Sequence, residues 1–139
     1  MARKFRTNVR VRYAETDRMG YCYYGNFATY FEVARVEALR ELGVTYRQLE
    51  DDGIVLPVLD FYIKYFKPAY YDDLLTIETL VTEVRGARIH FSYKTFNESG
   101  EQLNEATTTL VFVDFSTKRP INPPAWLSKI LTSCINTAD

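Results

Sequence analysis

The chain has 139 residues, of which 47% are hydrophobic and 25% charged, and a formal net charge of −1. This length and composition predict a single domain over residues 1–139 with a substantial core. Because the charges nearly cancel, they exclude a global field that favours nucleic acid or an anionic membrane surface. No apolar run reaches the length of a signal segment or a membrane span, so we expect no membrane span and a cytoplasmic location.

The first half of the chain combines a strand with a long helix. Apolar and polar residues alternate over residues 9–13, which predicts a strand with one covered face. Over residues 27–42 the apolar residues recur every three or four positions, as in an amphipathic helix. We expect Asn26 to cap the start of this helix and Gly43 to follow its end. Residues 45–52 predict a short second helix.

The second half is dominated by strands. Residues 54–67 are rich in β-branched and aromatic side chains, and residues 74–84, 87–96 and 102–115 predict three further strands. After a loop over residues 117–124, residues 124–131 predict a closing helix. One helix followed by consecutive long strands is typical of an α+β layer and not of a βαβ repeat.

The densest group of functional side chains lies in residues 13–27, between the first strand and the long helix. Asp17 precedes Gly20 and Gly25 there, close to a helix start that offers unpaired N–H groups and the positive end of its dipole. A carboxylate beside such donors suits acyl transfer, since the amides stabilise the oxyanion. The spacing alone also fits a turn former or a helix cap, which is the more common role of such an aspartate.

Other reactive side chains are less informative. Cys22 has no neighbouring histidine to activate it as a nucleophile, and Cys22 and Cys134 are too few and too unpatterned for a disulfide framework or a zinc site. The single histidine, His90, falls on the polar positions of an alternating strand, which indicates a solvated face. The expected helical ion pairs are Glu32 with Arg35 and Glu37 with Arg40.

Residues 12–43, RYAETDRMGYCYYGNFATYFEVARVEALRELG, resemble the start of the 4-hydroxybenzoyl-CoA thioesterase family, including its YbgC-like acyl-CoA thioesterases. Residues 61–79 are similar to the family's strand, proline and Asp-Leu-Leu segment, so the resemblance covers about residues 9–115. It implies the hotdog fold, in which a curved antiparallel sheet wraps a long central helix. The residues in register with the family pattern are Asp17, Gly20, Tyr23, Tyr24, Asn26, Phe27, Glu32, Ala34 and Arg35.

The resemblance also implies roles in catalysis. Asp17 matches the family's catalytic aspartate, acting as nucleophile or general base, and the turn with Tyr24 and Gly25 matches the backbone that polarises the thioester carbonyl. Many YbgC-like members have histidine where this chain has Tyr24, so no imidazole acts at this position. The implied reaction is hydrolysis of an acyl-CoA to a carboxylic acid and CoA. It uses no metal or other cofactor, because CoA enters as part of the substrate.

CoA carries phosphates that need basic side chains. The candidates are Arg85 and Arg88, which flank a turn at Gly86, and Lys118 and Arg119, which follow the last long strand; ordinary surface charge explains any one of them equally well. Hotdog domains pair through the sheet, so a homodimer or a homotetramer is expected.

Two alternative functions would use the same substrate-binding tunnel of a hotdog fold. A non-catalytic acyl-CoA binding or sensing protein would hold the ligand without cleaving it, and the presence of Asp17 argues against this. A thioesterase for acyl carrier protein would prefer a protein-bound substrate and would not depend on the basic candidates. The lack of histidine in the loop and the long helix argues against dehydration chemistry.

Overall fold

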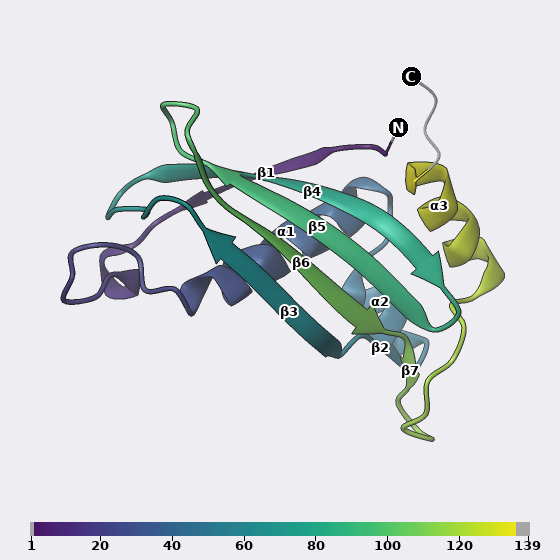
Figure 1. Cartoon of the computed structure of the whole chain (residues 1–139). Helices are drawn as coiled ribbons and strands as arrows, with labels where there is room; N and C mark the ends of the chain where they lie inside the picture. The colour runs from purple at the N-terminus through teal and green to yellow at the C-terminus, as the bar shows by residue number, and fades with distance from the viewer. Residues whose placement is uncertain (1, 136–139) are drawn as a thin grey trace.

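A long helix lies against a curved antiparallel sheet in the computed structural model, which describes residues 2–135 (Figure 1). The elements in chain order are β1 (Phe5–Arg10), the 3-10 helix η1 (Tyr13–Glu15), α1 (Asn26–Glu41), α2 (Tyr46–Asp51), β2 (Ile54–Val55), β3 (Val58–Tyr65), β4 (Leu74–Arg85), β5 (Arg88–Phe96), β6 (Gln102–Val111), β7 (Val113–Asp114) and α3 (Ala125–Ile135).

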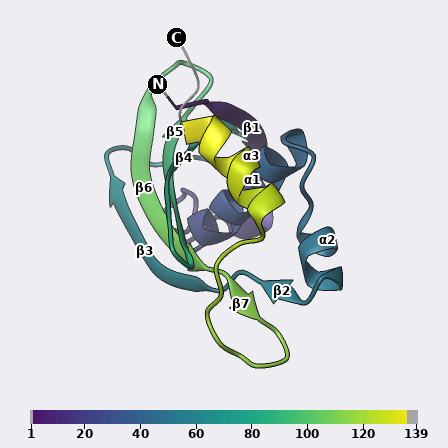
Figure 2. The ribbon, with the colours of Figure 1, turned by 90° about the vertical axis from the view of Figure 1, so that its right-hand side faces the viewer.

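The main sheet has the strand order β1-β4-β5-β6-β3, and every neighbouring pair is antiparallel. β4, β5 and β6 follow one another as a meander, whereas β1 and β3 pair with strands that come later in the chain. β2 and β7 form a separate two-stranded ribbon. Figure 2 shows the sheet curving around α1, with α3 beside it. The predicted α+β layer is therefore confirmed.

The core lies between the inner face of α1 and the concave face of the sheet. Alternation along β4 and β5 buries every second side chain, as the period of a strand requires. On β5 the buried positions are Ile89, Phe91, Tyr93 and Thr95, and the Tyr93 ring stacks on Phe31 of α1 with centroids 4.5 Å apart. Arg88 and Lys94, on the opposite face of β5, are exposed as expected, and His90 is half-buried.

The ends of α1 follow the predicted residues with one difference. Gly43, with φ 83°, follows the last turn, where its N–H donates to the Arg40 carbonyl. At the start, Gly25 occupies the cap position and no side chain caps the helix. The prediction that Asn26 caps it is wrong, because the Asn26 amide donates instead to the Glu15 carbonyl at 2.7 Å.

Three predicted strands have different bounds. The first strand ends at Arg10, and Tyr13 begins a 3-10 helix with its ring 77% exposed. The strand predicted over residues 54–67 is divided into β2 and β3 at Pro57, which has no N–H for a ladder. The strand predicted over residues 102–115 is divided at Phe112, whose N–H donates to the Ala87 carbonyl.

One predicted helical ion pair forms and the other does not. Arg40 lies 3.4 Å from Glu37, as expected. Arg35 is 5% exposed and turns into the core, where it donates to the Tyr93 hydroxyl at 3.2 Å, so its predicted pairing with Glu32 is wrong. Among the described residues, no helix is both long and apolar enough to cross a membrane.

Candidate active site

Asp17 lies in a short hairpin between η1 and α1. The Asp17 N–H donates to the Tyr21 carbonyl at 3.0 Å, and the Asp17 carbonyl accepts from the Gly20 N–H at 3.0 Å. Gly20 has φ 88°, a left-handed conformation that favours glycine. The Met19 N–H donates to Asp17 Oδ1 at 2.9 Å, whereas Oδ2 accepts no hydrogen bond from residues 2–135. The backbone thus fixes one carboxylate oxygen and leaves the other available.

A cavity of about 430 Å³ brings the Asp17 loop together with the start of α1 and the end of β3. Asp17 and Tyr24, two of the three predicted catalytic residues, both line it. The wall is mainly aromatic and apolar, which suits an acyl group. The lining residues are Asp17, Met19, Tyr21, Cys22, Tyr24, Phe27, Tyr65, Phe66, Lys67, Pro68 and Ala69.

The backbone before α1 presents two unpaired amides. The N–H groups of Asn26 and Phe27 donate to the carbonyls of Tyr23 and Tyr24. The N–H groups of Tyr24 and Gly25 have no acceptor within the described part of the chain. Gly25 is the N-cap of α1 and Tyr24 precedes it, so both N–H groups lie at a helix start, where the macrodipole favours negative charge. The third predicted site residue, Gly25, therefore supplies an amide next to the cavity wall formed by Tyr24.

Glu15 anchors the hairpin to α1 through a buried network that the sequence did not reveal. Its carboxylate accepts from the Arg12 N–H and guanidinium and from the Tyr30 hydroxyl, each at 2.8 Å. Its carbonyl accepts from the Tyr23 N–H at 2.8 Å and the Asn26 amide at 2.7 Å. Burial alone would raise the pKa of Glu15, but the hydrogen bonds from Arg12 and Tyr30 outweigh it and hold the pKa below its usual value.

Cys22 lines the cavity without the features of a nucleophile. It is 4% exposed, and its sulfur lies 3.5 Å from the Tyr30 hydroxyl. Burial raises the pKa of this thiol, which disfavours the reactive thiolate. No imidazole lines the cavity, and no described group of three or more His, Cys, Asp and Glu side chains is placed to hold a metal ion.

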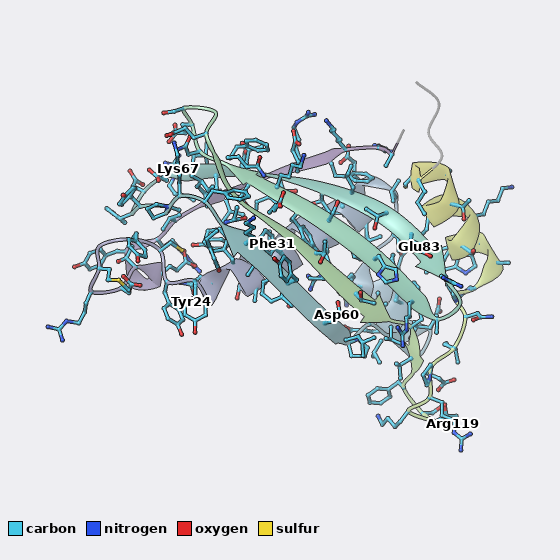
Figure 3. The ribbon with its side chains drawn as sticks, viewed as in Figure 1. Tyr24, Phe31, Asp60, Lys67, Glu83 and Arg119 are labelled. Carbon is cyan, nitrogen blue, oxygen red and sulfur yellow. The ribbon has the colours of Figure 1, made fainter. Side chains whose placement is uncertain are left out.

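Two further lining residues come from the end of β3 and the segment after it. The Tyr65 hydroxyl donates to the Tyr24 carbonyl at 3.0 Å, and burial raises the pKa of Tyr65 to about 12. Lys67 pairs with Glu101 at the cavity rim, and Figure 3 shows it above Tyr24. From the sequence alone, Tyr65 and Lys67 were predicted only as the last part of the strand over residues 54–67.

The four basic candidates for CoA lie away from this cavity. Arg85 and Arg88 line a groove of about 750 Å³ with Glu83 and His90, whose ring shares a hydrogen bond with Thr109. Leu59, at the start of β3, also lines the groove, whereas Tyr65 at the other end of β3 lines the cavity. Within one chain, the structure therefore separates Arg85 and Arg88 from Asp17.

Lys118 and Arg119 lie in the loop after β7, outside the groove. The Lys118 ammonium stands 3.5 Å from the centroid of the Phe115 ring, and Arg119 is exposed. Figure 3 places Tyr24 and Arg119 at opposite ends of the molecule.

A family model described as the Thioesterase-like superfamily matches residues 11–131. The chain belongs to this superfamily, and its fold agrees with that class of thioester hydrolases. The acyl-CoA thioesterase YbgC of Haemophilus influenzae is 37% identical over 117 residues, covering 84% of this chain and 85% of the relative. The acyl-CoA thioester hydrolase YbgC of Escherichia coli O157:H7 is 34% identical over 110 residues, covering 79% of this chain and 82% of the relative.

Solved structures support the same conclusion. The DHNA-CoA thioesterase from Staphylococcus aureus superposes with a TM-score of 0.87 at 36% identity, covering 94% of this chain and 92% of that one. The expected family, the hotdog fold and the assignment as a thioesterase enzyme are confirmed.

Proposed function

We propose that the chain hydrolyses an acyl-CoA to a carboxylic acid and CoA, with Asp17 as the catalytic carboxylate and the amides of Tyr24 and Gly25 as the oxyanion hole. The observation that carries this proposal is the shared cavity: Asp17 and Tyr24 line it together, and the two unpaired N–H groups belong to the same turn. The relatives named as acyl-CoA thioesterases and thioester hydrolases support the choice of substrate class.

Asp17 has two routes to the product. As a nucleophile, Oδ2 attacks the thioester carbonyl carbon, the C–S bond breaks, and water then hydrolyses the mixed anhydride. As a general base, Oδ2 takes a proton from a water molecule that attacks the same carbon; the C–S bond then breaks, and the departing CoA thiolate takes the proton from Asp17. Both routes form a tetrahedral oxyanion, which the orphan amides would stabilise. Neither route requires a metal or a redox cofactor.

The assembly we propose is a homodimer, alone or paired into a homotetramer. β3 is an edge strand with exposed Val58, Leu59 and Phe61, and exposed edges of this kind are suited to pairing with another strand. A second copy would also bring further basic residues to a cavity whose own lining includes Lys67, which is paired with Glu101. Arg85 and Arg88 are our first candidates for the CoA phosphates, because they share one groove with His90.

The test is release of the CoA thiol from short-chain, long-chain and aromatic acyl-CoAs by the parent and by Asp17→Asn. We expect the parent to cleave at least one of them and the variant to lose about 100-fold or more in kcat, the usual scale for a removed acid–base group. An unchanged kcat in Asp17→Asn, at an unchanged melting temperature, would contradict the mechanism.

The same panel separates the alternatives. A parent that binds acyl-CoA and cleaves nothing would be a sensing protein. A parent that cleaves only acyl groups carried on acyl carrier protein would be a carrier-protein thioesterase.

A further inference from the structure

The peptide unit between Tyr24 and Gly25 is held at one side only. Its carbonyl, which belongs to Tyr24, accepts from the Tyr65 hydroxyl at 3.0 Å and from the Phe27 N–H at 3.2 Å. Its N–H, which belongs to Gly25, has no acceptor among residues 2–135. Because a peptide unit is planar, a bond that fixes the carbonyl also fixes the direction of the N–H.

Tyr65 is well placed to hold this plane. It is the last residue of β3, where it pairs with Asn104 of β6, so the main sheet sets its backbone position. Its ring meets Phe27 edge to face, with centroids 5.8 Å apart, and it also lines the cavity. Burial raises the pKa of Tyr65 to about 12, so at neutral pH the hydroxyl keeps its proton and can donate.

We infer that Tyr65 is a positioning residue for the oxyanion hole, which aligns and polarises the Tyr24–Gly25 peptide through its hydroxyl. This inference rests on the proposed function. A donor at the carbonyl draws electron density through the amide and makes the N–H a stronger donor, an effect that grows where water is excluded. The Tyr65 hydroxyl donates to the Tyr24 carbonyl and acts through that peptide, so its contribution falls on the transition state and not on substrate binding.

Tyr65→Phe removes only the hydroxyl, and Tyr62→Phe is its matched control. Tyr62 is on the same strand, is 63% exposed, and its hydroxyl makes no hydrogen bond within the described residues. We expect Tyr65→Phe to lower kcat about five- to tenfold with KM changed by less than about twofold, on the scale of an indirect contribution to an oxyanion hole. Tyr62→Phe should leave both constants within about twofold of the parent.

A spectroscopic measurement separates polarisation from a general structural effect. Benzoyl-CoA is bound to Asp17→Asn, and the stretching frequency of its thioester carbonyl is measured by infrared difference spectroscopy. We expect a shift to lower frequency on binding, and a smaller shift when Tyr65→Phe is added to Asp17→Asn. Adding Tyr62→Phe instead should leave the shift unchanged.

The outcomes distinguish this inference from the function on which it rests. An equal carbonyl shift with and without the Tyr65 hydroxyl, together with a parental kcat in Tyr65→Phe, would overturn it. A higher KM at unchanged kcat would also overturn it, because Tyr65 would then be only a wall of the cavity. A parent that cleaves no acyl-CoA would instead contradict the proposed function.

Discussion

Gly25 has φ −63° and ψ −22°, values that any residue can adopt. A Cβ at this position would lie 2.6 Å from Cε2 of the Tyr23 ring, which is closer than carbon atoms can pack. The neighbouring ring, and not the backbone conformation, therefore opposes a side chain at the entrance to α1, and a substitution there must displace the exposed Tyr23 ring. The constraint acts on the residue that we propose as an oxyanion-hole donor.

We expect Gly25→Ala to fold, because the helical conformation tolerates alanine, and to lower kcat about tenfold or more. The new methyl group would push the Tyr23 ring and the adjoining amides away from their positions, and one oxyanion donor is worth about 100-fold or more. The measurement is steady-state kinetics beside a thermal melt. Gly25→Ala combined with Tyr23→Leu should recover part of kcat, and parental activity in the single variant would argue against the amide's role.

At the residue scale, the sequence was informative about Asp17 and silent about its supports. The register of Asp17, Gly20 and Asn26 with the family pattern identified the catalytic candidate, and that pattern can be read because those residues are close together in the chain. Tyr65 is 41 positions from the carbonyl that it binds. Glu15 reaches Tyr30 across 15 positions, and only the packed fold brings such partners together.

At the scale of elements, the join between η1 and α1 depends on Glu15. This residue accepts five hydrogen bonds, from the N–H and side chain of Arg12, the Tyr30 hydroxyl, the Tyr23 N–H and the Asn26 amide. Asp17 follows two residues later, so the same network sets the distance between the catalytic loop and the helix start. A buried acceptor with many donors is costly to remove.

The depressed pKa of Glu15 predicts how stability depends on pH. The stabilisation is present above the unfolded pKa of glutamate, about 4.3, and is lost as the pH falls through the lower folded value. We expect Glu15→Gln to reduce the free energy of unfolding at pH 7, and the difference from the parent to shrink below about pH 4. Denaturant unfolding of both proteins between pH 3 and pH 7 measures this difference in the free energy of unfolding.

Glu50→Gln is the control, because Glu50 is exposed on α2 and makes no ion pair within residues 2–135. It should follow the parent at every pH. A gap between Glu15→Gln and the parent that stays constant with pH would show that the carboxylate charge of Glu15 contributes nothing.

The sequence predicted most elements and missed their interruptions. Residues 45–52 carry a capping box that can be read locally, with Thr45 accepting from the Gln48 N–H at 3.1 Å. The division at Pro57 follows from the missing N–H of the proline itself, whereas the division at Phe112 depends on a contact between distant segments, the bond from the Phe112 N–H to the Ala87 carbonyl.

At the scale of the whole molecule, the cavity and the basic groove lie at opposite ends of β3. If the groove of one chain binds the phosphates of a CoA whose thioester lies in the cavity of a neighbouring copy, removing the positive charge of the groove should weaken nucleotide binding. It should leave the chemistry unchanged. We expect Arg85→Ala with Arg88→Ala to raise KM for an acyl-CoA about tenfold, and to leave KM for the matching acyl-pantetheine unchanged, since that substrate lacks the nucleotide.

Arg47→Ala with Lys129→Ala is the charge-matched control, because both residues are exposed and make no ion pair in the described chain. Lys118→Ala with Arg119→Ala tests the second basic pair in the same assay. An equal rise in KM for both substrates would mean that the groove does not recognise the nucleotide.

The exposed edge of the sheet gives a prediction about assembly. We expect the parent to sediment as a dimer of 16.2 kDa chains or as a pair of dimers, and Val58→Lys to shift it toward the monomer with loss of activity. Val58 is 50% exposed on β3, and a charge on an edge strand opposes pairing. Phe115→Lys, on the loop after β7, is the control. A monomeric, fully active parent would contradict the proposed assembly.

The strand order has a consequence for how the chain is made. Among residues 2–135, β3 pairs only with β6, so residues 58–65 leave the ribosome well before residues 102–111 can cover them. During that interval an aromatic, β-prone segment has no partner, which is the condition that favours misassembly of nascent chains. Asp60 and Lys64 interrupt this segment with charge and are suited to a protective role until synthesis of β6 is complete.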